Sequence, residues 1–191
     1  MKYRGYNKLA LFFIFFTIII SCEKETPEPP VGESNYKQPL IIGDSYAGGI
    51  IFYVDNTGDH GLVCAPSDQS SGAEWGCYDT YTEAYEETVG TGAQNTILIE
   101  SVCTTSGTAA DICANLVLNG YSDWFLPSID ELMLMKDKLY DADLGSFSTQ
   151  YYWSSTEYNS QRAIRYFFSH YGDWDYDSKE ITCRVRAVRA F

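Results

Sequence analysis

The stretch GYSDWFLPSIDELMLM (residues 120–135) contains the clearest local signal in the chain. Ser128, followed three residues later by Glu131, forms a capping box, in which each side chain accepts a free backbone N–H at a helix start. Asp130 and Glu131 also lie in the first turn, where the helix dipole favours acids. The stretch therefore predicts a helix of about three turns with one apolar face toward the core. That face comprises Ile129, Leu132, Met133, Met135 and Leu139.

Before this helix, the chain contains a strand-rich segment followed by a long polar one. Residues 49–54 and 62–65 are rich in β-branched and aromatic residues and enclose a cluster of Asp, Asn and Gly. This pattern predicts a hairpin. Residues 67–91 are polar and rich in Gly, Ser and Asp, and they predict long irregular loops.

Helices and further strands complete the pattern. Residues 95–102 and 108–118 predict two short helices, and residues 151–155, 163–168 and 182–190 predict strands. Strands, then helices, then strands indicate an α+β domain. Because the domain begins and ends with strands, we expect the terminal strands to pair.

The N-terminus has the layout of an exported lipoprotein. Three basic residues precede an uncharged run over residues 9–20, and Ser21-Cys22 follows. This is the layout of a secretory signal peptide, and residues 19–22 resemble the bacterial lipobox. The resemblance implies removal of residues 1–21 and acylation of Cys22, whose acyl chains would anchor the protein stably in a membrane. The uncharged run would span only about 18 Å as a helix, too short for a hydrocarbon core of roughly 30 Å.

The segment after Cys22 predicts a tether, and the remainder predicts one domain. Residues 22–39 contain four prolines and many polar residues, a composition that favours an extended spacer. Residues 40–191 are enough for one domain with a sizeable core. We expect the protein in the cell envelope, lipid-anchored to the outer membrane on its periplasmic or cell-surface side.

The charge balance excludes some classes of partner. Removal of residues 1–21 takes away three of the 13 basic residues and no acid, which changes the formal net charge from −13 to −16. Nucleic acid should repel such a chain. Six of the remaining basic residues follow position 161: Arg162, Arg165, Lys179, Arg184, Arg186 and Arg189. They predict either solvated strand faces or a local basic patch for an anionic glycan or carboxylate.

Five cysteines remain if Cys22 is acylated. An exported domain matures under oxidising conditions, so two disulfides and one free thiol are the expectation. We favour the pairs Cys103–Cys113 and Cys64–Cys183, with Cys77 left over, although sequence alone does not decide connectivity. The second pair assumes that the paired terminal strands bring Cys64 near Cys183.

Aromatic residues concentrate late in the chain. Residues 151–176 contain ten of them, of which we expect Trp153, Tyr166 and Phe168 to enter the core. Other rings lie among polar residues, beside two arginines, where loops are expected. Such rings can stack on sugars or side chains, while arginine binds carboxylate or sulfate. The candidate ligand-binding residues are therefore Tyr158, Arg162, Arg165, Tyr171, Trp174 and Tyr176; the alternative is that the rings only cover the edge of a small core.

No catalytic or cofactor motif supports an enzyme. His60 and His170 have no nucleophile signature near them and are predicted to be surface turn residues. Asp173, Asp175 and Asp177 alternate, but the Gly and Glu of a calcium loop are replaced by Ser178 and Arg184, so they predict a solvated turn. No metal site, no cofactor and no enzymatic activity are expected.

Several motifs resemble those of one family. They are GGIIFYVD (residues 48–55), AADICANL (109–116), GYSDWFLPS (120–128), YWSSTE (152–157) and VRAVR (185–189). Together they resemble the DUF1566 family, related to the C-terminal domain of the Legionella collagen-like adhesin, over residues 44–191. Phe125 stands where the family usually has Arg, so any role of that Arg is absent here.

The resemblance implies a C-type-lectin-like domain with mixed, mostly antiparallel sheets, two main helices and long loops. The sugar-binding motifs of calcium-dependent lectins, Glu-Pro-Asn and Trp-Asn-Asp, do not occur in this sequence. Calcium-dependent sugar binding is therefore not implied. The expected function is that of a membrane-anchored, non-enzymatic module that binds a glycan or protein ligand, as an adhesin does. The alternative is a structural or accessory component of an envelope assembly.

Overall fold

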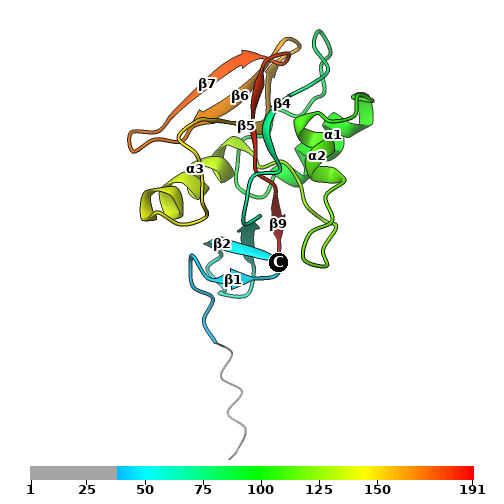
Figure 1. Cartoon of the computed structure of the whole chain (residues 1–191). Helices are drawn as coiled ribbons and strands as arrows, with labels where there is room; N and C mark the ends of the chain where they lie inside the picture. Colours follow the sequence, from blue (N-terminus) through cyan, green and yellow to red (C-terminus); the bar gives the residue numbers. More distant parts are fainter. Residues whose placement is uncertain (1–37) are drawn as a thin grey trace, which may run out of the picture. The chain divides into compact units, whose positions relative to one another are not determined.

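The first and last strands of the described chain belong to one antiparallel sheet, where they form its two edges (Figure 1). The structure is a computed structural model that describes residues 38–191. In the order β1-β2-β3-β9, this sheet comprises β1 (Ser45–Tyr46), β2 (Gly49–Val54), β3 (Gly61–Cys64) and β9 (Val188–Ala190). Val63 on β3 lies opposite Arg189 on β9. The predicted hairpin and the predicted pairing of the terminal strands are confirmed.

The second sheet has five strands in the order β4-β8-β5-β6-β7. They are β4 (Ser70–Glu74), β8 (Thr182–Val185), β5 (Tyr151–Asn159), β6 (Arg162–Phe167) and β7 (Asp173–Ser178). Only the pairing of β5 with β8 is parallel among these neighbours. Sequence reasoning missed β4 and β7, which it assigned to loops and a turn. The strand expected over residues 182–190 is divided between β8 and β9, and so between the two sheets.

Helices connect the two strand-rich parts. They are α1 (Gly92–Val102), α2 (Ala109–Ala114), α3 (Ile129–Lys138) and the short 3-10 helix η1 (Tyr140–Ala142). α1 begins three residues earlier than expected, and α2 ends four residues earlier. Two mostly antiparallel sheets with two main helices, α1 and α3, confirm the expected α+β fold class.

The central strand of the second sheet, β5, is largely buried on both of its faces. Adjacent residues on β5 point to opposite sides: Trp153 joins a core cluster with Trp75 and Trp124, whereas Tyr152 joins another with Phe52. α1 packs against β5, and α3 packs against β5 and β6; the two helices flank the sheet on opposite sides (Figure 1). The expected burial of Trp153, Tyr166 and Phe168 is confirmed, because each is at most 6% exposed.

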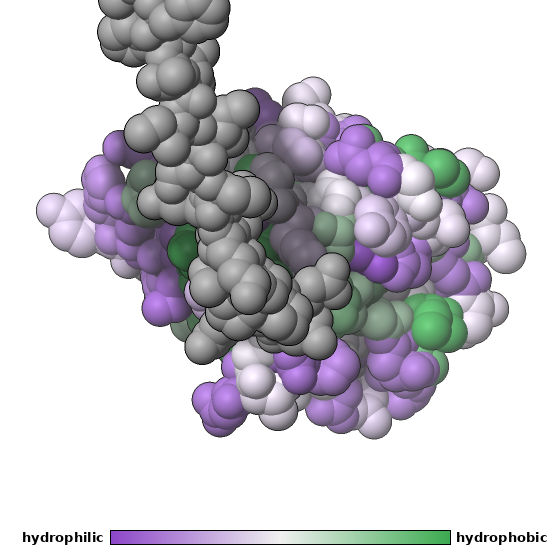
Figure 2. All heavy atoms as spheres, turned by 90° about the horizontal axis from the view of Figure 1, so that it is seen from below, coloured by the Kyte–Doolittle hydropathy of each residue, from purple (hydrophilic) through white to green (hydrophobic). Residues whose placement is uncertain are grey.

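The end of the domain that carries β1 and β2 presents a mixed surface. In Figure 2, the visible part of this end is mainly hydrophilic, and its hydrophobic residues form separate spots. Scattered hydrophobic residues are normal on a soluble surface. The visible part of this end therefore shows no continuous hydrophobic patch.

The start of α3 has the predicted capping box. The Ser128 hydroxyl accepts the Glu131 N–H at 3.3 Å, and the Glu131 carboxylate accepts the Ser128 N–H at 2.8 Å. The other Glu131 oxygen accepts the N–H of Gly90 at 2.8 Å. Burial raises the pKa of Glu131, and these N–H donors oppose the rise. One buried carboxylate therefore joins the start of α3 to the loop before α1.

Ser128→Ala should destabilise the protein without changing the fold. The substitution removes the cap of Glu131 N–H and also the hydrogen bond from Ser128 to the carbonyl of Thr88. We expect a loss of about 1 kcal/mol in the free energy of unfolding, measured by urea denaturation. A Ser178→Ala variant, at the end of β7, is the control; an equal loss in both variants would contradict the capping role.

The disulfide of the described chain corrects the sequence prediction. Cys77 bonds to Cys103, with Cα atoms 5.5 Å apart, whereas Cys64, Cys113 and Cys183 are free and buried. The predicted pairs Cys103–Cys113 and Cys64–Cys183, with Cys77 left over, are therefore wrong. Cys64 and Cys183 belong to different core clusters, and Cys183 lies on β8, not on the strand that pairs with β3.

The partner choice of Cys103 follows from the local backbone. Gly76 has φ +96°, and its α-carbon packs so closely on Thr108 and the Cys103 sulfur that a side chain there would clash. Because Gly76 packs this closely, the next residue, Cys77, lies at the end of α1, next to Cys103. Cys113, one helix further on, is instead fully buried in the core.

The three buried thiols should resist alkylation in the native protein. Burial raises the pKa of Cys64 to about 12 and that of Cys183 to about 11, so the reactive thiolate is scarce. We expect maleimide to label Cys64, Cys113 and Cys183 only after denaturation, and mass spectrometry to find the Cys77 and Cys103 peptides linked. A linked Cys64–Cys183 peptide would contradict the structure.

Candidate functional site

Four of the six candidate residues share one face of the second sheet. Trp174 and Tyr176 on β7 lie opposite Tyr166 and Ile164 on β6, and residues directly opposite in a sheet point to the same side. The rings of Tyr158 and Tyr176 stack, with centroids 4.0 Å apart. The Arg162 guanidinium lies 5.4 Å from the Tyr176 ring centroid. We call Tyr158, Arg162, Trp174 and Tyr176 the aromatic face.

A pocket adjoins the aromatic face at the start of α3. It has a volume of about 190 Å³ and is lined by Glu87, Ile129, Asp130, Met133, Ile164 and Trp174. Trp174, which is 51% exposed, belongs to both the pocket and the aromatic face. The Asp130 N–H donates to the carbonyl of Glu87 at 3.1 Å and so fixes the two acidic residues side by side. We call this pocket the α3 pocket.

Sequence reasoning missed the acidic side of this site. For Glu87 the sequence predicts only that it lies in a loop. For Asp130 it predicts only a place in the first helical turn, where the helix dipole favours an acid. Met133 was expected to be core, but it is 36% exposed and lines the α3 pocket. The helical period places Met133 next to Ile129, but no local feature of the sequence indicates that Met133 lines a pocket.

Arg165 is not part of the aromatic face. It lies on β6 opposite Asp175, and its guanidinium binds Asp175 at 3.3 Å and Asp177 at 2.6 Å. It also lies 3.9 Å from the ring centroid of Tyr151, on the other side of the sheet from Trp174. Asp175 and Asp177 are thus counter-charges of Arg165, in a strand and not in the turn expected from the sequence.

Tyr171 is also separate from the other candidates. It lies in the turn between β6 and β7 and is 99% exposed. No ring contact or hydrogen bond of its side chain is present among residues 38–191. Tyr171 therefore serves as a reference for an aromatic side chain outside the site.

The late basic residues do not form a basic patch. Arg184 and Arg186 both bind Asp68, at 2.8 and 2.6 Å, and Arg189 binds Asp123 at 2.7 Å. The hydrogen bonds from Arg189 lower the pKa of Asp123.

Lys179 is likewise a structural cation. It is fully buried, binds Glu157 at 2.6 Å and lies 4.5 Å from the Trp75 ring centroid. Burial lowers the pKa of Lys179, and Glu157 opposes this shift. Of the six basic residues after position 161, only Arg162 has no carboxylate partner within the described part of the chain. The alternative of solvated strand faces is also wrong for most of them, because they are largely buried ion-pair partners.

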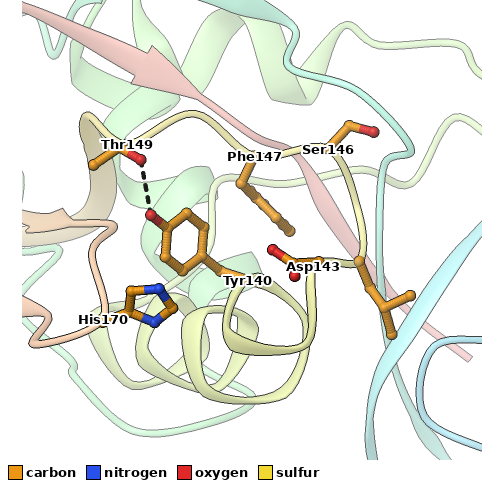
Figure 3. Close-up of a pocket in the computed structure, with 7 residues that line it drawn as sticks. Tyr140, Asp143, Ser146, Phe147, Thr149 and His170 are labelled. Atoms are coloured by element: carbon orange, nitrogen blue, oxygen red, sulfur yellow. Dashed lines mark hydrogen bonds between the residues drawn. The ribbon is translucent and has the colours of Figure 1, made fainter.

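A second pocket, of about 320 Å³, lies beside η1 (Figure 3). The Tyr140 hydroxyl and Thr149 Oγ1 are 2.8 Å apart, and His170 lies at the rim with its side chain 81% exposed. Ser146 and His170 are on opposite sides of this pocket (Figure 3), so they do not form a nucleophile–base pair. His60 is exposed as well, and the prediction that both histidines are surface residues is confirmed.

Residues 38–191 contain neither a metal-binding cluster nor a membrane-spanning helix. No group of three or more His, Cys, Asp or Glu side chains there has a geometry that could hold a metal ion. In the same range, no helix has the length and apolar character needed to cross a membrane.

The family can now be stated from comparison with known proteins. The family model of the Lcl C-terminal domain matches residues 66–189. The chain belongs to this family. The match confirms the resemblance to the C-terminal domain of the Legionella collagen-like protein. A search of curated proteins finds no match to the chain. Membership suggests an adhesin-like domain, and the matched residues include the aromatic face and the whole α3 pocket.

Proposed function

We propose that this protein is a non-enzymatic binding module that recognises neutral carbohydrate through the aromatic face and the α3 pocket. The observation that carries this proposal is the exposure of Tyr158 and Trp174 on one rigid sheet face beside two carboxylates. Flat aromatic rings cover the apolar C–H faces of sugars. Carboxylates accept hydrogen bonds from sugar hydroxyl groups.

The rigidity of the site favours binding by preorganised rings. Tyr176 contacts both Tyr158 and Arg162, and both β6 and β7 are paired over their whole length. Rings that are already fixed lose little conformational freedom on binding, so more of the contact energy appears as affinity.

The charges of the site favour a neutral ligand over an anionic one. Glu87 and Asp130 line the α3 pocket, and Arg162 is the one basic residue of the aromatic face. A sulfate or uronate group near Glu87 and Asp130 would meet like charge. These charges therefore support an uncharged glycan, rather than an anionic one, as the ligand.

A protein ligand is the second candidate, because further exposed tyrosines lie on the loop that supplies Glu87 to the α3 pocket. Tyr81 and Tyr85 are 64% and 58% exposed. They belong to the loop that supplies Glu87 and that contacts β5 through the hydrogen bond from Glu157 N–H to the carbonyl of Ala84. Tyrosine-rich surfaces are typical of protein interfaces, which fits the alternative of an accessory component of an envelope assembly.

Trp174→Ala should remove glycan binding. We expect the chain from residue 23 onward to bind neutral glycans on an array, and the substitution to weaken binding about tenfold or more, the effect of roughly 1.4 kcal/mol of lost ring contact. Tyr171→Ala removes a ring that is even more exposed but lies outside the site, and it should leave binding unchanged.

The array also separates the two candidate functions. Binding that persists in Trp174→Ala, or binding confined to sulfated glycans, would contradict the proposed site. No glycan signal, together with a protein partner whose crosslinking is lost in Tyr85→Ala, would favour the accessory role instead.

We further propose that the domain is exported and lipid-anchored at the outer membrane through Cys22, on the periplasmic or cell-surface side. Residues 1–21, the anchor residue Cys22 and residues 23–37 lie outside the described residues. The lipobox-like residues 19–22 support the anchor, and the disulfide Cys77–Cys103 is compatible with an oxidising compartment.

Radioactive palmitate should label the intact protein in cells and should not label a Cys22→Ala variant. The label arises because the acyl chains are attached to Cys22 itself. Protease treatment of whole cells then tests which side the domain faces. An unlabelled protein recovered from the cytosol would contradict the anchor.

A further inference from the structure

A third pocket lies between α1, the end of α2 and residues 123–125. Its volume is about 450 Å³, within the range of small-ligand sites. Apolar walls come from Ala93, Ile97, Ala114 and Phe125, and polar groups come from Glu100 and Trp124. We call it the α1 pocket.

Two buried polar atoms of the residues that line the α1 pocket have no hydrogen-bond partner. These atoms are Nε1 of Trp124 and Oε1 of Glu100, within the described part of the chain. Trp124 is only 3% exposed. The other two buried tryptophans show the usual arrangement, because Trp75 Nε1 donates to Ser154 at 2.8 Å and Trp153 Nε1 donates to Ala73 at 2.9 Å. Buried polar atoms nearly always have partners, so two unpartnered ones on residues that line the same pocket point to a ligand.

The charges near the pocket favour a cation. Glu100 contributes a carboxyl group, and its pKa is raised by burial and by Asp111. Asp123 also lines the pocket and is bound to Arg189. Among the residues that line the pocket, none is basic. A ligand ammonium would give Glu100 the opposite charge that it lacks.

We propose that the α1 pocket binds a small amine whose ammonium group is held by Glu100, whose carbonyl or hydroxyl oxygen accepts from Trp124 Nε1, and whose apolar body lies against Ile97 and Phe125. An amino-acid amide and the amino-terminus of a peptide both have this chemistry. The inference is independent of the proposed glycan site, because the two pockets share no residue.

Leucinamide is a suitable probe because it combines an ammonium group, a carbonyl group and an apolar side chain. The full chain, labelled with ¹⁵N, should show a shift of the Trp124 indole N–H signal on titration with leucinamide. N-acetyl-leucinamide lacks the ammonium, and isopentylamine lacks the acceptor, so each should bind at least tenfold more weakly. A tripeptide amide that begins with leucine then distinguishes a free amine from a peptide amino-terminus: the tripeptide binds only if the pocket accepts a continuing chain.

Glu100→Gln keeps the shape of the side chain and removes its charge. We expect it to weaken leucinamide binding at least tenfold, the lower range for a charge-assisted hydrogen bond. Glu180→Gln, on an exposed turn between β7 and β8, makes the same change of charge and should bind as the unmodified chain does. The proposal is overturned if the Trp124 signal does not shift at about 10 mM leucinamide, ten times a Kd of about 1 mM. It is also overturned if Glu100→Gln or the acetylated probe binds equally well.

Discussion

The buried carboxylate of Glu131 is the contact on which the arrangement of the binding face depends. It accepts N–H groups from Ser128, in its own helix start, and from Gly90, 41 residues earlier in the chain. Gly92 packs so closely on this carboxylate that a side chain at Gly92 would collide with it. A polar group this deeply buried is tolerated only when it is fully hydrogen-bonded. Glu131 therefore holds the loop before α1 and the start of α3 in one fixed relation.

The neighbouring contacts extend this relation to β5. The N–H of Ile129 donates to Thr156 Oγ1, whose hydroxyl in turn donates to the carbonyl of Glu86, and the N–H of Ser155 donates to the carbonyl of Pro127. The loop, the helix and the sheet thus meet at one buried point. Glu87 and Asp130 emerge beside it, next to Trp174 on β7. The site is made of three segments whose proximity no local sequence pattern predicts. The buried hydrogen bonds between the loop, the helix and the sheet explain why these segments lie together.

The sequence predicts those features that depend on local chemistry. The capping box at Ser128 and Glu131, the apolar face of α3 and the hairpin around residues 55–60 all follow from neighbouring residues, and all are present. β7 was missed because Asp173, Asp175 and Asp177 disfavour strands; it forms because Arg165 binds two of these acids and because Trp174 and Tyr176 pack beside Tyr166 and Ile164. The disulfide and the ion pairs were missed because each joins residues that are distant in the sequence, and local patterns do not show such contacts. The aromatic residues of the site could be named from composition, but Glu87 could not.

Residue-resolved hydrogen exchange tests the role of Glu131 most directly. In the unmodified protein, the amides of Gly90 and Asp130 should be protected, because both are hydrogen-bonded at the buried point. In Glu131→Ala, these two amides should exchange much faster, while the amides that pair β2 with β3 keep their protection. The control is Glu86→Ala, which removes an exposed acid of the same loop and should behave as the unmodified protein does. Unchanged protection of Gly90 and Asp130 in Glu131→Ala would contradict the account.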